Sequence, residues 1–195
     1  MTRPAGGYLL SRATGLNLLI VLTIAVVLAL LSRFVMAAIF REVAGFEPFD
    51  LQAPLSRNML AIELGTMDKG TAMGFYIPFM AIDVLFAVAS AFVYALFWGW
   101  LFAKVPTRLF AFLRQGGILL APFAAIFCDL AAKGGFVRLL HGLSGPAYAA
   151  AIEFSVTAHR FKYAFVDLRN YLSVAFVLVA CISLALARAS GKSSA

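Results

Sequence analysis

The sequence predicts an all-α integral membrane protein, built as a four-transmembrane-helix bundle with cytoplasmic N and C termini. Of its 195 residues, 63% are hydrophobic and 13% are charged, whereas soluble domains are about 45–50% apolar and about 25% charged. Four apolar runs are each long enough, at ~1.5 Å per helical residue, to cross a ~30 Å hydrocarbon core. No polar stretch is long enough to form a soluble core. We therefore expect one transmembrane domain over residues 1–195, with spans at about 15–40, 74–103, 116–140 and 160–188.

The charge and cysteine patterns argue against two other classes of protein. The formal net charge is +7, but the basic residues flank apolar runs and do not alternate with aromatic residues, as a nucleic-acid groove requires. Cys128 and Cys181 lie inside apolar stretches without CxxC spacing, so the sequence predicts neither a disulfide framework nor a metal site. The cofactor stays unknown. The partners we expect are the lipid bilayer and either further copies of the chain, as a homo-oligomer, or a larger membrane complex, but no nucleic acid.

The first apolar run, residues 15–40, follows a short basic segment and is interrupted only by isolated polar residues. A cleaved signal peptide is the alternative interpretation, because residues 35–37 resemble a small-residue cleavage site. The run is longer than the ~7–15 apolar residues usual in signal peptides. We therefore expect a transmembrane span.

The longest polar connection, residues 41–71, is predicted to be an outer loop that contains a short amphipathic helix. Ser56 is a plausible N-cap, and the apolar residues that follow it have helical spacing. These are Met59, Leu60, Leu64 and Met67. Such a helix can lie on the membrane surface. The functional alternative is a lid over the outer mouth of the bundle.

The second span, residues 74–103, carries one acidic residue followed by small residues at every fourth position. These are Asp83, Ala87, Ala91, Ala95 and Gly99. Positions four apart are neighbours on a helix surface, and small residues let transmembrane helices approach closely enough for van der Waals packing to hold them together. We expect the alanines and the glycine to form a helix-packing face. An unpaired Asp inside a bilayer costs about 2.5–3.5 kcal/mol, so Asp83 should face protein or water.

The third span, residues 116–140, repeats this pattern in the opposite order. Small residues at Gly117, Ala121 and Ala125 come first, and charged residues at Asp129 and Lys133 follow, again four apart. Because consecutive spans are antiparallel, the small faces of spans two and three can meet with their charged residues at one level. We predict that these two spans form a closely packed antiparallel pair.

The fourth span is predicted at residues 160–188. Residues 142–158 before it begin with a Gly-rich turn and a helix start near Pro146. The span contains Lys162, Asp167 and Arg169. The last two residues are only two positions apart and point to different sides of the helix, so each needs a partner elsewhere.

The distribution of charge along the chain predicts the orientation. The N-terminus, residues 104–114 and the C-terminal tail contain basic residues and no acidic residue, which favours a cytoplasmic location for all three segments. The basic residues are Arg3, Arg12, Lys104, Arg108, Arg114, Arg188 and Lys192. An aromatic group at the end of span two, Trp98, Trp100 and Phe102, is typical of the headgroup level. We expect a multi-pass protein of the cell membrane (plasma or inner).

With the spans oriented in this way, charged residues from three helices share one level in the outer half. They are Asp83, Asp129, Lys133, Lys162, Asp167 and Arg169. Asp129 and Lys133 have the i,i+4 spacing and order of a favourable pair within one helix. For Asp83 we expect Arg169 as the partner, with Lys133 as the alternative.

Two functions fit this cluster. The first is a non-enzymatic, transporter- or channel-like protein whose cluster forms a polar site for an ion, a proton or a small polar solute. The second is an accessory or assembly subunit of a larger membrane complex, in which a purely structural salt-bridge network locks the helices. An enzyme is less favoured, because the sequence places no nucleophile beside a base, and His141 and His159 lack the spacing of metal ligands.

Overall fold

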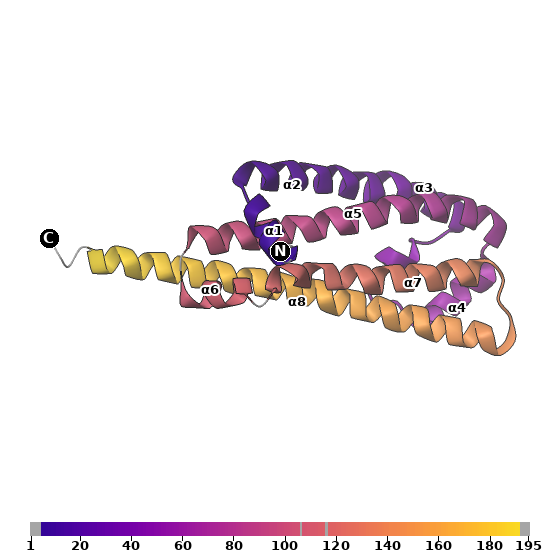
Figure 1. Ribbon diagram of the computed structural model, residues 1–195. Coiled ribbons are helices and arrows are strands. Elements are labelled where there is room, and N and C mark those ends of the chain that lie inside the picture. The colour runs from indigo at the N-terminus through magenta and orange to yellow at the C-terminus, as the bar shows by residue number, and fades with distance from the viewer. Residues whose placement is uncertain (1–4, 106, 116, 192–195) are drawn as a thin grey trace.

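In the computed structural model, the described residues are 5–105, 107–115 and 117–191, and their regular elements are all helices (Figure 1). Arg3, Gly116 and Lys192, which enter the predictions above, lie outside these residues. Two short segments, η2 and η3, are 3₁₀-helices, and η1 is a π-helix. The elements are α1 (Ala5–Arg12), α2 (Gly15–Leu30), η1 (Leu31–Met36), α3 (Ala37–Ala44), η2 (Phe49–Leu51), α4 (Arg57–Thr66), α5 (Lys69–Lys104), α6 (Arg108–Gln115), η3 (Ile118–Phe123), α7 (Ala124–Leu140) and α8 (Gly145–Gly191).

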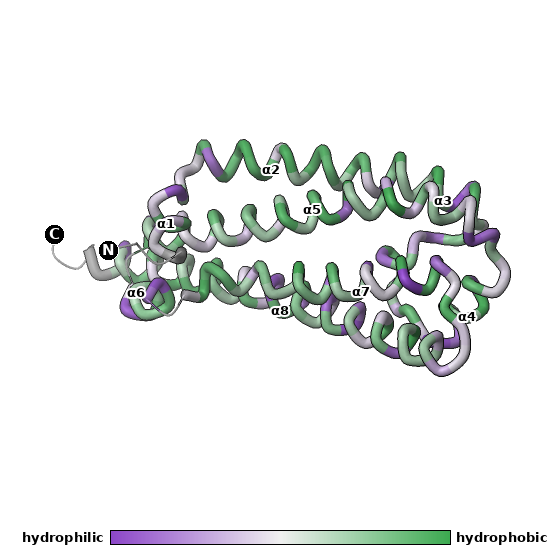
Figure 2. The backbone as a smooth tube through the Cα atoms, turned by 45° about the vertical axis from the view of Figure 1, so that its right-hand side comes forward, coloured by the Kyte–Doolittle hydropathy of each residue, from purple (hydrophilic) through white to green (hydrophobic). Residues whose placement is uncertain are grey.

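Four of the described helical stretches are long and apolar enough to cross a membrane. They are Gly15–Ala44, Lys69–Lys104, Ile118–Leu140 and Gly145–Ala189. The apolar residues follow the length of these helices in Figure 2. Residues 142–158, treated as a separate segment in the sequence analysis, belong to one continuous α8. The polar residues near position 160 do not end this helix, because two of them, His159 and Lys162, face the protein interior.

Figures 1 and 2 show that α2 and α3 run along α5 and that α7 runs along α8. Spans two and three do pack together, through α5 against η3 and α7. However, α7 has its most extensive contacts with α8, and α5 with α2. The predicted pairing of spans two and three is therefore one of several interfaces and not the main one.

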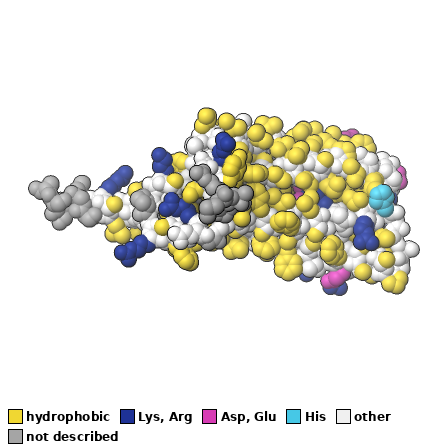
Figure 3. Space-filling view, viewed as in Figure 1, with side chains coloured by type: hydrophobic (Ala, Val, Ile, Leu, Met, Phe, Trp, Pro, Cys, Tyr) yellow, Lys and Arg dark blue, Asp and Glu magenta, His cyan; other side chains and the backbone are white. Residues whose placement is uncertain are grey.

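The two ends of the bundle differ in charge. One end, here called the basic end, contains α1, α6 and the C-terminal ends of α5 and α8, whereas α4 and the turn between α7 and α8 lie at the opposite, loop end (Figure 1). The described residues that define the basic end are Arg12, Lys104, Arg108, Arg114 and Arg188. Figure 3 shows Lys and Arg side chains around the basic end and a predominantly hydrophobic surface along the middle.

The small residues of α5 are buried as a face of the helix. Ala91 and Ala95 are fully buried, and a Cβ atom built on Gly99 would lie 2.9 Å from Ala13 Cβ. Gly99 therefore packs against the connection between α1 and α2, where a side chain would not fit. Trp98 and Phe102 are also buried in this region, so these two rings pack against the protein, and their level in a membrane stays a prediction.

The small residues of the third span do not share one face. Gly117 has a φ of 72° and precedes the 3₁₀-helix η3, which contains Pro122. A 3₁₀-helix has 3.0 residues per turn, so positions four apart no longer align. Ala121 is consequently exposed, whereas Ala125 in α7 is buried. The predicted packing face is thus wrong for Ala121.

The loop between α3 and α5 folds against the bundle. The helix expected here is α4, and Ser56 Oγ accepts a hydrogen bond from Met59 N as its N-cap. Asp68 caps α5 in the same way and extends this helix beyond its predicted start. The hydroxyl of Thr71, followed by the N–H of Gly70, lowers the pKa of Asp68, so this cap is present above pH 3.8 and is lost as the pH falls through the lowered pKa.

The buried apolar residues form two clusters. The first cluster, toward the loop end, includes Phe40, Phe49 and Phe136, and the second, toward the basic end, includes Trp98 and Phe176. Three buried Asp residues and a buried Lys belong to neither apolar cluster. Helices α7 and α8 approach closely at Gly135, where an added Cβ atom would lie 2.0 Å from Ser155 Oγ and 3.1 Å from Ser155 Cβ.

Gly135→Ala is therefore expected to destabilise the fold by about 1–3 kcal/mol, because the added methyl forces α7 and α8 apart. Gly134→Ala is the matched control, since a Cβ atom there meets nothing within 4 Å, and it should be neutral or slightly stabilising. Reversible unfolding in mixed micelles measures both. Adding Ser155→Ala to Gly135→Ala should restore part of the loss. Equal stability of the two glycine variants would contradict the close contact.

Candidate functional site

The buried ammonium group of Lys133 lies among three carboxylates from three different elements. Lys133 Nζ is 2.6 Å from both oxygens of Asp129, 2.8 Å from Asp83 Oδ2 and 3.2 Å from Asp50 Oδ1. Asp129 is one turn before Lys133 on α7, Asp83 is on α5 and Asp50 is on η2. All four side chains are almost completely buried. This arrangement ties the loop and two helices to one cation.

A second cation, Lys162 of α8, reaches the same carboxylates. Its Nζ is 2.5 Å from Asp129 Oδ1, 3.9 Å from Asp50 Oδ1 and 4.0 Å from Asp83 Oδ2. We call these five residues, Asp50, Asp83, Asp129, Lys133 and Lys162, the charge cluster. Three carboxylates and two ammonium groups leave it with one formal negative charge. Buried charges are tolerated when they are paired in this way.

Asp50 is the member of the cluster that sequence reasoning missed. Its neighbour Phe49 packs against Phe136 and Tyr76, with ring centroids 5.2 and 5.6 Å apart. Asp50 then accepts a hydrogen bond from Tyr76 Oη on Oδ2 at 2.6 Å, and its backbone carbonyl accepts one from Tyr163 Oη at 3.1 Å. The apolar residues on both sides of this acid, Phe49 and Leu51, are the sequence signal that could have placed Asp50 inside the protein.

The π-helix η1 supplies a further contact to the cluster. Ser32 is fully buried and donates a hydrogen bond to Asp83 Oδ1 at 3.2 Å. The N–H of Ala37 bonds to the carbonyl of Ser32, five residues earlier. This wider turn places Ser32 and the buried Ala37 on the same inner side of the helix. In an α-helix, two residues five positions apart would point to different sides. It also leaves Arg33 lining the adjacent cavity.

Arg169 is not the partner of Asp83, so the preferred pairing is wrong and the alternative, Lys133, is right. Arg169 is seven residues beyond Lys162 on α8, which is about 10.5 Å along the helix. At that level it donates a hydrogen bond from Nη1 to Ser90 Oγ at 3.2 Å, and its guanidinium lies 3.9 Å from the centroid of the Tyr94 ring. Asp83 lies too far toward the loop end to meet it.

Asp167 does not join the charge cluster either. It is exposed on α8, and it forms no ion pair with any residue in the described part of the chain. Being two positions from Arg169, it lies on a different side of the helix. The sequence could not assign the face of α8 on which Asp167 lies.

A cavity of about 170 Å³ extends from the charge cluster to Arg169. Each of its three main walls contributes a pair of residues that are seven positions, or two helical turns, apart, with one residue at each end of the cavity. The pairs are Asp83 and Ser90 on α5, Asp129 and Pro122 on α7 and η3, and Lys162 and Arg169 on α8. We call it the central pocket. Ala87 and Ala125 line its middle. These two residues were predicted to close a helix contact, but their short side chains leave space instead.

The loop that carries Asp50 is held by a second set of polar contacts. His159 Nε2 lies 2.8 Å from the carbonyl of Gln52, so this ring nitrogen carries the proton and donates. The side-chain amide of Gln52 donates to both carboxylate oxygens of Glu63 on α4, at 3.1 and 3.0 Å. Partial burial raises the pKa of Glu63, and the hydrogen bond from Gln52 partly offsets this. The loop is therefore fixed over the cluster from two sides.

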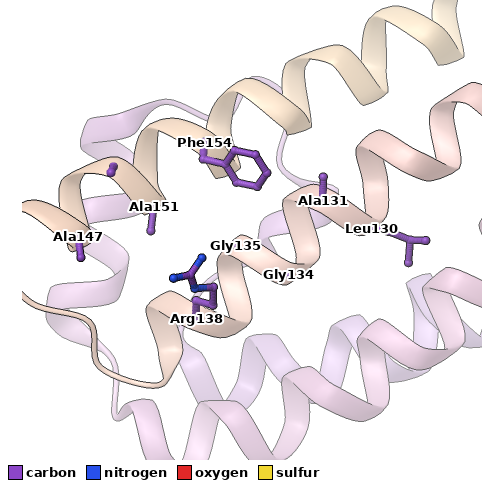
Figure 4. A pocket seen from close by; sticks show the side chains of 9 residues that line it. Leu130, Ala131, Gly134, Gly135, Arg138, Ala147, Ala151 and Phe154 are labelled. Carbon is purple, nitrogen blue, oxygen red and sulfur yellow. The ribbon is translucent and has the colours of Figure 1, made fainter.

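A larger groove of about 570 Å³ lies between α7 and α8, and Figure 4 shows its lining. Its walls are mainly glycine, alanine and leucine, including Gly134, Ala147 and Ala151. Arg138 is its one charged lining residue among those described, and it extends from α7 toward α8 (Figure 4). Without converging polar groups, this groove has no chemistry comparable to that of the central pocket.

The three carboxylates have oxygens within 4.8 Å of one another, a spacing that would suit a metal ion. Lys133 Nζ lies within 3.2 Å of each of them and so takes the central position. The chemistry that this arrangement offers is charge pairing and the binding of polar groups. No family model, curated protein or solved structure matches the chain.

Lys133→Met should cost about 3–5 kcal/mol of folding free energy, because it leaves three buried carboxylates with a single cation at their edge. Asp83→Asn should lower the folding free energy by a smaller amount, because its side-chain amide can still accept the hydrogen bond from Ser32. The two remaining carboxylates still pair with both lysines. Lys104→Met is the control, as Lys104 is exposed at the end of α5. Unfolding in mixed micelles ranks the three variants, and a Lys133→Met protein as stable as the control would refute the central role of this ammonium.

Proposed function

We propose that this chain is a multi-pass protein of the cell membrane whose central pocket binds and moves an ion, a proton or a small polar solute. The observation that carries the proposal is that the charge cluster borders a cavity of about 170 Å³. A dry structural lock needs no such space. Intramembrane ionisable residues that face a cavity are typical of ion and substrate pathways.

The proposed orientation places the basic end in the cytoplasm. Five of the described residues at the basic end are Arg or Lys, and the sequence has no acidic residue in segments 104–114 and 188–195. Basic residues without acids favour the cytoplasmic side. In α5, Asp83 is then about 21 Å from the outer end of the helix at Lys69 and about 32 Å from its inner end. The central pocket lies near the middle of the span.

A second function is supported by a different observation. Each of the three carboxylates already has a lysine ammonium within 3.2 Å, which is what a structural lock in an accessory or assembly subunit requires. In that case the ion pairs serve only to hold α5, α7 and the loop together, and the chain acts as a subunit of a larger membrane complex. The two functions differ in whether the central pocket is reached by water.

Water access can be measured by cysteine labelling. In a background with Cys128 and Cys181 replaced by alanine, Ala87→Cys should react with the small anionic reagent 2-sulfonatoethyl methanethiosulfonate at least ten-fold faster than Ala91→Cys. Ala87 lines the central pocket, whereas Ala91 is one turn further along the same face of α5 and fully buried. Equal, slow labelling of the two cysteines would favour the structural lock.

Transport is tested in proteoliposomes that contain a pH-sensitive dye or a radiolabelled solute. The wild-type chain is expected to conduct at least one of protons, sodium ions or small carboxylates, and Asp83→Asn should reduce that flux at least ten-fold. Asp167→Asn is the matched control, because Asp167 is an acid of the same bundle that lies outside the cluster. A wild-type protein that conducts none of these would support the accessory subunit instead.

A further inference from the structure

Arg169 is a part-buried cation without an acidic partner. The described contacts of its guanidinium are with two uncharged side chains, the Ser90 hydroxyl, which accepts from Nη1, and Tyr94, through both its ring face and its hydroxyl. Its Nε atom is buried and has no hydrogen-bond partner among the described residues. No ion pair links Arg169 to an Asp or Glu in the part of the chain that the structure covers. An arginine at this depth normally pairs with an anion.

The place of Arg169 in the central pocket shows where such an anion would lie. Arg169 and Ser90 stand at one end of the pocket, about 10.5 Å from the charge cluster at the other end. Arg33, which is exposed on η1, adds a second guanidinium to the lining. The carboxylates of the cluster are occupied by Lys133 and Lys162. An anion from outside the chain is therefore the complementary partner.

We propose that the Arg169 end of the central pocket binds the carboxylate group of a small organic anion. This proposal rests on the proposed function, because it names the class of solute for the same pocket. A guanidinium presents a planar fork of N–H donors that matches a carboxylate. With one Nη1 hydrogen directed at Ser90 and Nε buried, the donors left for the ligand are the other hydrogens on the two terminal nitrogens.

The remaining walls favour an organic anion over a bare inorganic one. Phe86, Ala87 and Val166 give the middle of the pocket an apolar surface. Its volume of about 170 Å³ is the space of roughly five or six water molecules at ~30 Å³ each. An anion of two to four carbon atoms can therefore place its carboxylate at Arg169 and its carbon atoms along these walls. Chloride would leave most of this space unused.

The test is isothermal titration calorimetry on the full chain in detergent micelles. The probes are sodium acetate, sodium propionate and sodium L-lactate, each compared with its uncharged amide, and sodium chloride. At least one carboxylate should bind with 1:1 stoichiometry and at least ten-fold more tightly than its amide and than chloride. Because this comparison uses the unaltered protein, it does not depend on whether a variant folds.

Arg169→Gln should weaken binding of that carboxylate at least ten-fold, and Arg169→Lys by a smaller factor. Arg160→Gln is the matched control on the same helix, since Arg160 is exposed and does not line the central pocket. The affinity of this variant for the carboxylate should stay within two-fold of that of the wild type. Binding of no carboxylate, equal binding of amide or chloride, or full affinity in folded Arg169→Gln protein would each overturn the proposal.

The results also separate this proposal from the proposed function. If protons or sodium ions cross proteoliposomes in a manner that depends on Asp83 while no carboxylate binds, the transport function stands and the anion proposal fails. If a carboxylate binds at Arg169 but nothing crosses, the anion site stands and the transport function fails.

Discussion

The contact on which the rest of this structure depends is that of the Lys133 ammonium with three carboxylates. In lipid, helices gain nothing from burying apolar surface against one another, so polar contacts and close packing must hold them. Lys133 joins α7 to α5 through Asp83 and to the loop through Asp50. The aromatic residues around Phe49 can hold the loop only because its neighbouring carboxylate has a cation to meet. Charge pairing and apolar packing thus support each other at this point.

The central pocket follows from the residues on either side of this contact. The bundle has two apolar clusters, and the charged residues belong to neither. Bulky side chains close the helix interfaces within the clusters, for example Trp98 against Phe176 at 5.2 Å. Near the charge cluster, the walls of α5 and α7 are instead Ala87 and Ala125. Lys162 and Arg169 of α8 reach α7 and α5 at the two ends of the pocket, and the short alanine side chains between these contacts leave the cavity.

Composition and spacing predicted the four long helices and the pair of Asp129 with Lys133. They did so because hydrophobic length and i,i+4 spacing are local properties of a sequence. The features that the sequence did not predict depend on contacts between residues that are far apart in the chain. Asp50 reaches the cluster through the packing of Phe49 against Tyr76 and Phe136, which are distant in the sequence. The face of Ala121 depends on the 3₁₀ geometry of η3, and the choice of Lys133 over Arg169 for Asp83 depends on which helices are neighbours and at what level.

The charges on the walls of the central pocket do not balance one another locally. The charge cluster has one formal negative charge in excess, whereas Arg33 and Arg169 are cations on the walls of the same pocket, Arg169 being about 10.5 Å further along α8 than Lys162. At an effective dielectric constant of ~20, opposite unit charges at that separation attract by about 1.6 kcal/mol. This is less than the ~2.5–3.5 kcal/mol cost of one unpaired charged side chain in hydrocarbon. The charges at the two ends of the pocket therefore compensate each other only in part, which favours the proposed function, in which water or a charged solute occupies the pocket, over a dry structural lock.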